Sequence, residues 1–132
     1  MKSEAEELGF EIEDLSYDLD KMAVYDESDL HIGYRVHAHI YCLSHRVKSI
    51  LIHEDGRGEG VSQAINLQGI NAYMTLVDEN SKIRKIVNDY TRKSLTDYIQ
   101  ELEESDYKVF DNVQNTLKTN FKSMEKFLEL LP

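Results

Sequence analysis

The chain has 132 residues, of which 41% are apolar and 30% charged, with one cysteine and a net charge of −10. This length favours a single domain, residues 1–132, with enough buried surface for an ordinary core. The negative charge disfavours nucleic acids and anionic membranes as partners. No apolar run is long enough to cross a membrane, the acidic start does not resemble a signal peptide, and one cysteine cannot form an internal disulfide. We therefore expect a cytoplasmic protein.

Most of the negative charge lies in an acidic segment, residues 1–29. Residues 1–30 hold eleven acids against two lysines. Apolar residues recur there with the spacing of one helix face, at Leu8, Ile12, Leu15, Leu19 and Met22, which predicts an amphipathic helix over residues 10–24. Its opposite face would be anionic, either as a solvated surface or as a docking surface for a basic protein. The remaining alternative is a disordered acidic tail. The candidate docking residues are Glu11, Asp14, Tyr17, Asp18, Asp20 and Tyr25.

Residues 30–77 are expected to form a sheet. Apolar and polar residues alternate from Leu30 to Tyr41, which predicts a half-buried strand, and residues 47–53 and 70–77 predict further strands. Between them, residues 55–60 contain three glycines and predict a loop. Arg57 in this loop could contact a phosphate or a carboxylate, although an exposed turn is the simpler interpretation. Short connections favour an antiparallel sheet of three to four strands.

The first predicted strand carries a candidate metal site. His37 and His39 are two residues apart, so on a strand their side chains would emerge on the same face within reach of one zinc or other transition-metal ion. His45 would be a third ligand if the next strand pairs back on the first. A His-x-His pair without a second spaced pair is weakly specific. Solvent-facing histidines and no cofactor are therefore the first expectation.

Residues 78–132 predict two long helices. One apolar stripe runs from Ile83 to Leu102, and another runs from Phe110 to Leu131 in steps that average 3.5 residues. The acids around Glu103 break the pattern, which predicts an antiparallel helical hairpin. The expected fold is thus α+β, with an acidic N-terminal helix, an antiparallel sheet of three to four strands and a long C-terminal hairpin. Such helices exceed the sheet in length, so we expect a homodimer through them.

The function favoured by size and charge is a small interaction module that inhibits a basic partner protein by stoichiometric binding. Immunity proteins and phage-encoded anti-defence inhibitors act in this manner. No catalytic residues are expected, because the candidate carboxylates fall on exposed faces and no nucleophile stands in a typical context. Two alternatives remain open. One is a metal-binding protein or metal-dependent hydrolase centred on the His-x-His pair, and the other is a purely structural homo-oligomeric subunit.

Overall fold

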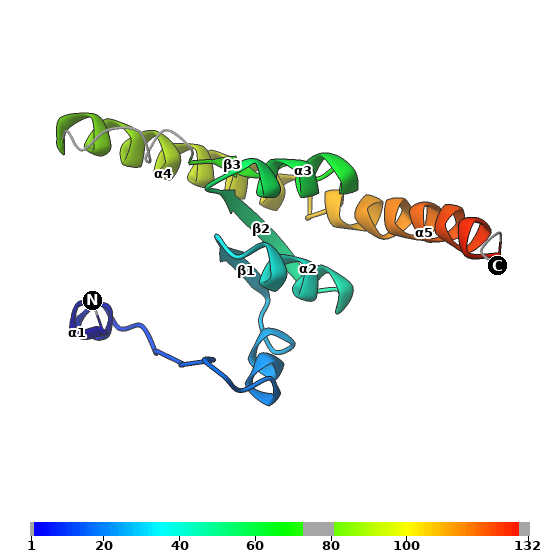
Figure 1. The fold of residues 1–132 in the computed structure, drawn as a ribbon. Helices are drawn as coiled ribbons and strands as arrows, with labels where there is room; N and C mark the ends of the chain where they lie inside the picture. The colour runs from blue at the N-terminus through cyan, green and yellow to red at the C-terminus, as the bar shows by residue number, and fades with distance from the viewer. Residues whose placement is uncertain (1, 73–80, 130–132) are drawn as a thin grey trace.

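The computed structural model describes residues 2–72 and 81–129 and contains a sheet of three parallel strands (Figure 1). The strands are β1 (Leu30–Gly33), β2 (Lys48–His53) and β3 (Ile70–Asn71), in that spatial order. The helices are α1 (Lys2–Glu7), the 3₁₀ helix η1 (Asp20–Tyr25), α2 (Val36–Ser44), α3 (Gly56–Ile65), α4 (Ser81–Glu104) and α5 (Val109–Leu128). Ile50 lies opposite Ile32, and Ile52 lies opposite Ile70, in parallel register. The predicted antiparallel sheet is therefore wrong.

The parallel arrangement follows from the connections between the strands. α2 joins β1 to β2, and α3 joins β2 to β3. A helix between two strands carries the chain back to the end of the sheet where the first strand began, so the second strand runs parallel to it. An antiparallel pair needs only a short turn. β2 is the central strand of the sheet, and its residues Ile50, Leu51 and Ile52 are all buried. A continuous apolar run of this kind is typical of a parallel strand that is covered on both faces.

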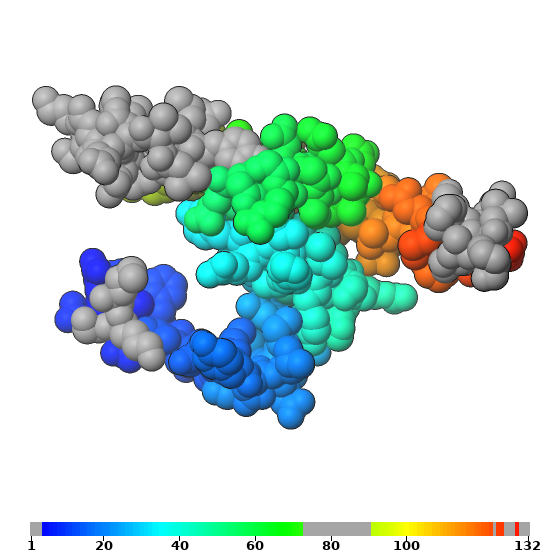
Figure 2. Space-filling model, in the orientation of Figure 1, coloured from blue at the N-terminus to red at the C-terminus, as the bar shows by residue number. Residues whose placement is uncertain are grey.

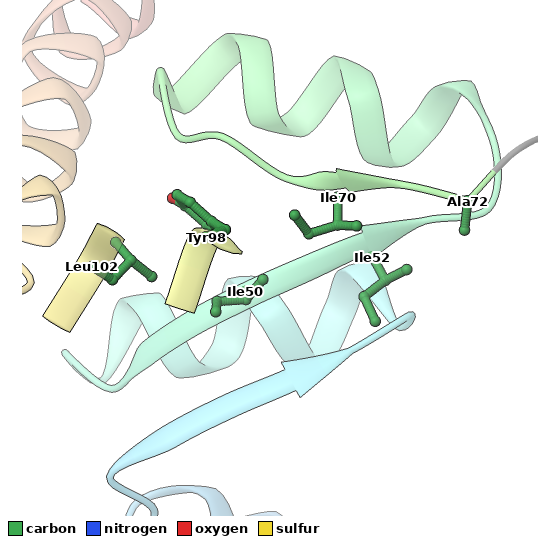
Figure 3. Packing of buried hydrophobic residues seen from close by; sticks show 6 residues of the cluster. All are labelled: Ile50, Ile52, Ile70, Ala72, Tyr98 and Leu102. Carbon is green, nitrogen blue, oxygen red and sulfur yellow. The ribbon is translucent and has the colours of Figure 1, made fainter. Parts of the chain in front are cut away.

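The two faces of the sheet differ in chemistry. On one face, Ile50 and Ile52 pack with Ile70 against Tyr98 and Leu102 of α4 (Figure 3). Burial of each isoleucine or leucine side chain in such a cluster contributes about 1.5–3 kcal/mol. Alternation along β2 turns Ser49, Leu51 and His53 to the opposite face, which α2 and α3 cover. That face is partly polar, and it carries buried histidine and serine side chains.

α5 attaches to the ends of α2 and α3 rather than to α4. Val113 of α5 is buried with Leu43 and Leu67, and Gln114 Nε2 donates to the Leu43 carbonyl oxygen at 3.2 Å. Figure 1 shows α4 and α5 extending away from each other, so the predicted antiparallel hairpin does not form. The two long helices themselves, and the break near Glu103, are confirmed. None of the described helices is both long enough and apolar enough to cross a membrane.

Three further expectations are corrected. The strand predicted from Leu30 to Tyr41 ends at Gly33, and the rest of it belongs to α2. The loop predicted over residues 55–60 holds the N-cap and first turn of α3, because Asp55 caps this helix. Residues 10–19 are not helical; the acidic segment contains only the short helices α1 and η1. Of the strand predicted over residues 70–77, β3 is confirmed, and residues 73–77 lie outside the described part of the chain.

Candidate functional site

A hollow of about 260 Å³ opens at the carboxyl ends of β1 and β2. α2 and α3 both begin at this edge, directly after the two strands. In open sheets of parallel strands, ligands bind outside the carboxyl ends of the strands where the strand order reverses. The described strands, in the order β1-β2-β3, have no such reversal, so this hollow is judged by the residues that line it. The hollow is lined by Tyr34, Arg35, Val36, His37, Ile52, His53, Glu54, Asp55, Arg57 and Gly58.

The N-terminus of α2 carries no side-chain cap. Arg35 is its N-cap residue, in an extended conformation with φ −86° and ψ 109°, and no side-chain hydrogen bond caps the helix. The first backbone N–H groups of a helix have no partner within the helix, and the helix dipole adds partial positive charge there. The exposed side chains of Arg35 and His37 line the hollow beside this terminus. Backbone and side chains together therefore present donors and positive charge.

The N-terminus of α3 is capped in contrast. Asp55 Oδ1 accepts a hydrogen bond from the Arg57 backbone N–H at 2.9 Å, and its other oxygen accepts from Arg57 Nε at 2.8 Å. The hydrogen bonds from Arg57 lower the pKa of Asp55, and the same pairing raises the pKa of Arg57. Asp55 and Arg57 thus neutralise each other at the rim, so the arrangement leaves α2 as the anion-seeking terminus.

A second hollow of about 480 Å³ adjoins the first on the α4 side of the sheet. The two share Tyr34, Ile52 and Glu54. Thr91 of α4 lines the second hollow, and its hydroxyl is buried without a hydrogen-bond partner. A ligand larger than a single anionic group therefore has room to extend across the carboxyl edge from one hollow to the other.

Behind the first hollow, a cluster of histidines and serines fills the space between the sheet and the two covering helices. The Oγ atom of Ser49 lies 2.7 Å from His39 Nδ1 and 2.8 Å from His31 Nδ1. His53 Nε2 lies 2.9 Å from the Oγ atom of Ser62 on α3. Burial, reinforced by the charges that His31 and His53 would carry, lowers the pKa of His39 to about 4. His39 is therefore neutral at pH 7, and burial lowers the pKa of His31 and of His53 as well. The cluster serves in packing and hydrogen bonding.

The structure separates the predicted metal ligands. His37 and His39 lie on α2 instead of a strand, where residues two apart face different directions. His37 is exposed at the hollow, His39 is buried, and His45 pairs with Asp26 at 2.7 Å while stacking on Tyr41. Among the side chains that the structure describes, no group of three or more histidines, cysteines, aspartates or glutamates is arranged to hold a metal ion.

The predicted docking residues all lie in the acidic segment: Glu11, Asp14, Tyr17 and Asp18 precede η1 in non-helical chain, and Asp20 and Tyr25 begin and end η1. Figure 2 shows the acidic segment in blue, standing largely apart from the rest of the molecule in this view. Tyr25 is the exception, because it packs edge-on against His31 with 5.4 Å between ring centroids. The exposed candidates are Glu11, Asp14, Tyr17, Asp18 and Asp20. They share one segment, but no helical face aligns them.

The candidate site at the carboxyl edge was missed by the sequence prediction, apart from the phosphate contact considered for Arg57. Arg35 was assigned to the middle of a strand, so no helix start was expected beside it. The available signal was the pair of helix starts that directly follow β1 and β2, marked in the second case by Asp55 as an N-cap. Comparisons with models of protein families, with curated proteins and with solved structures find no match. The function is therefore argued from the geometry.

Proposed function

We propose that this protein binds a small anionic ligand, a phosphate- or carboxylate-bearing molecule, at the carboxyl edge of its parallel sheet. The observation that carries the proposal is the uncapped N-terminus of α2, which opens onto the hollow beside Arg35 and His37. Unpartnered N–H groups at a helix start bind phosphate and carboxylate oxygens directly. A guanidinium beside them adds two parallel donors and a full charge.

The carboxylates around the hollow set the limits of this proposal. Asp55 is paired with Arg57 and with the α3 backbone, so its negative charge is already neutralised. Glu54 is exposed and lines both hollows. An anionic group is therefore expected at the α2 end, next to Arg35, with Glu54 beside an uncharged part of the ligand.

Thermal unfolding of the full chain in increasing pyrophosphate, at constant ionic strength, tests the proposal. A ligand that binds only the folded state raises the melting temperature in a saturable manner. We expect Arg35→Gln to remove most of this rise. Arg46→Gln is the matched control, because Arg46 is also exposed and follows the opposite end of α2. Inorganic phosphate and citrate serve as smaller and carboxylate-only probes.

Two results would contradict the proposal. One is the absence of a saturable shift with all three anions. The other is an equal loss in Arg35→Gln and Arg46→Gln, which would indicate general charge screening rather than a site. A shift that disappears only with Arg35→Gln supports binding at the α2 terminus.

A second function is proposed for the acidic segment, as a binding surface for a basic protein. Its support is the exposure of large apolar side chains among the acids, with Leu8, Phe10 and Leu19 at 73%, 64% and 86% of full exposure. Apolar anchors surrounded by acids suit a basic partner, and electrostatic steering would raise the rate of association with it at low salt.

We also propose a cytoplasmic location, with which the single buried thiol of Cys42 is compatible.

The inhibitor proposal predicts salt-sensitive association. Replacing Asp14, Asp18 and Asp20 together by asparagine should slow association with a basic partner markedly, because these acids are exposed and contribute to steering. An association rate that is unchanged by the triple variant and by salt would remove this second function.

A further inference from the structure

The apolar stripe of α5 continues past the part of the helix that the core covers. Val113 is buried at 1% exposure, and Leu117 packs at the edge of the same cluster. The next stripe positions, Phe121 and Met124, are 54% and 50% exposed. They follow Leu117 in steps of four and three residues, so they lie on the same face of the helix. The outer half of α5 therefore presents an uncovered apolar face.

This outer face is hollowed and flanked by positive charge. A groove of about 740 Å³ runs along it, and its lining includes Leu117, Phe121 and Met124, the two lysines Lys118 and Lys122, and one acid, Glu125. Both lysines are exposed, and neither forms an ion pair with any side chain that the structure describes. From residue 117 to residue 128 the chain carries three lysines and one glutamate. An apolar groove with a basic margin suits an apolar segment with acidic neighbours.

The acidic segment has the complementary composition. Leu8, Phe10 and Ile12 are exposed at 73%, 64% and 38%, and they are interleaved with the exposed acids Glu7 and Glu11. Exposed apolar side chains of this size, spaced closely along one short stretch, mark a segment that binds a surface. Opposite charges beside them would fix the orientation of the segment on its target and speed the encounter.

The two surfaces lie at opposite sides of the molecule. Figure 1 places the N-terminal helix α1 far from the outer half of α5, and the sheet with its covering helices lies between them. Within one chain the acidic segment and the α5 groove therefore do not meet. In a pair related by a two-fold axis, each acidic segment can lie on the α5 groove of the other chain, which makes two identical contacts and closes the assembly.

We propose that the chain forms a symmetric homodimer in which residues 7–13 of each copy, a part of the acidic segment, dock on the outer groove of α5 in the other copy. The inference rests on the second function proposed above and names the basic surface that the acidic segment binds. Phe10 and its apolar neighbours enter the groove, and Glu7 and Glu11 face Lys118 and Lys122. It is independent of the ligand site at the carboxyl edge of the sheet.

Sedimentation equilibrium of the full chain at low and high salt is the first measurement. A dimer is expected, and its dissociation constant should rise with salt because the flanking ion pairs are exposed and screened. Two charge-reversed variants sharpen the result: Lys118→Glu with Lys122→Glu, and Glu7→Lys with Glu11→Lys. Each variant alone should weaken self-association by about tenfold or more, since four attractive pairs across the two contacts become repulsive.

Mixing the two charge-reversed variants provides the decisive test. In a mixed dimer, the unchanged acids of one chain face the unchanged lysines of the other, and the two reversed sets also face each other with opposite sign. Dimerisation should therefore return to about the level of the natural chain in the mixture only. Glu101→Lys with Glu103→Lys is the matched control for Glu7→Lys with Glu11→Lys, because it makes the same change in net charge on exposed positions of α4 and should leave self-association close to unchanged.

A monomer at all salt concentrations, or a dimer that the reversals leave intact, would overturn the inference. Loss of dimer in both variants without recovery in the mixture would also overturn it, since it would show a general effect of charge. These outcomes do not decide whether the acidic segment binds a foreign basic protein. That second function is decided separately by the association rate of the triple aspartate variant.

Discussion

Nδ1 of His39 on α2 lies 2.7 Å from the hydroxyl of Ser49 on β2, at a point where both residues are almost completely buried. His31 on β1 approaches the same hydroxyl at 2.8 Å. A serine hydroxyl has one proton, so the arrangement that satisfies the hydroxyl and both Nδ1 atoms has Ser49 donating to one imidazole and accepting an N–H from the other. The two histidines then hold opposite tautomers. Ser49 thus links a helix and two strands behind the candidate ligand site.

Ser49→Ala should destabilise the protein by about 1–3 kcal/mol, because it leaves a buried imidazole nitrogen without a partner. Urea unfolding measures this change. Ser44→Ala on α2 is the matched control, since the Ser44 hydroxyl is exposed and bonds only to the Tyr41 carbonyl oxygen at 2.7 Å; its cost should stay within about 0.5 kcal/mol. Equal effects in the two variants would show that Ser49 does not organise the cluster.

The histidine cluster also predicts loss of stability in acid. Burial lowers the pKa of His31 and of His53, and it lowers the pKa of His39 to about 4. In the unfolded chain these imidazoles have a pKa near 6.5, whereas in the folded chain they bind protons only at lower pH. The contribution of His39 is therefore fully present above about pH 6.5 and is lost as the pH falls toward 4, by up to about 1.4 kcal/mol per pH unit. The lowered pKa values of His31 and His53 act in the same direction.

Unfolding free energies measured between pH 7.5 and pH 4.5 check this prediction. His39→Gln, which keeps a hydrogen-bonding group beside Ser49, should reduce the slope with pH. His37→Gln should leave the slope unchanged, because His37 is exposed at the end of the same helix. A slope that is the same in all three proteins would mean that other groups cause the acid sensitivity.

The same cluster explains why α2 was mistaken for part of a strand. Its buried positions are Ala38, His39, Cys42 and Leu43, which have the spacing of one helix face. His39 is polar, so the sequence pattern placed it on the solvent side and matched an alternation of period two that continues from β1. Only the hydrogen bond to Ser49, a contact between distant residues, makes this imidazole a core residue.

α3 was mistaken for a loop for a related reason. Glycine costs a helix interior about 1 kcal/mol relative to alanine, so three glycines argue against a helix on local grounds. The structure uses the small size of one of them, because Gly58 is buried against His53. Because the prediction did not recognise α2 and α3, the connections between the strands were taken to be short, which favours an antiparallel sheet. The apolar run of β2 and the long periodic helices α4 and α5 were predicted correctly, since their patterns do not depend on distant partners.

Gly69 is predicted to be essential for the packing of His53. A Cβ atom at position 69 would lie 1.9 Å from His53 Nε2, which requires the ring to move. Gly69→Ala should therefore destabilise the protein by about 1–3 kcal/mol or more. At Gly60, within α3, a Cβ atom would have no heavy atom within 4 Å, and Gly60→Ala should instead stabilise by about 0.5–1 kcal/mol.

A double-mutant cycle with His53→Ala separates steric conflict from backbone strain at Gly69. If the conflict is with the imidazole, Gly69→Ala should cost much less in the His53→Ala background, with a coupling of about 0.5–3 kcal/mol. Additive effects would place the cost in the backbone and remove the steric explanation.

At the carboxyl edge, the position of Glu54 predicts a gain of binding on substitution. Glu54 lines both hollows, and its charge opposes the anionic group that we place beside Arg35. Glu54→Gln should tighten pyrophosphate binding by about two- to fivefold, the effect of one exposed charge at short range, and the gain should shrink as salt is added. Isothermal titration measures the affinities. Glu101→Gln, which makes the same change in charge at an exposed position of α4, should leave the affinity nearly constant. Weaker binding in Glu54→Gln would instead indicate a ligand that presents a cation or a hydrogen-bond donor to this carboxylate.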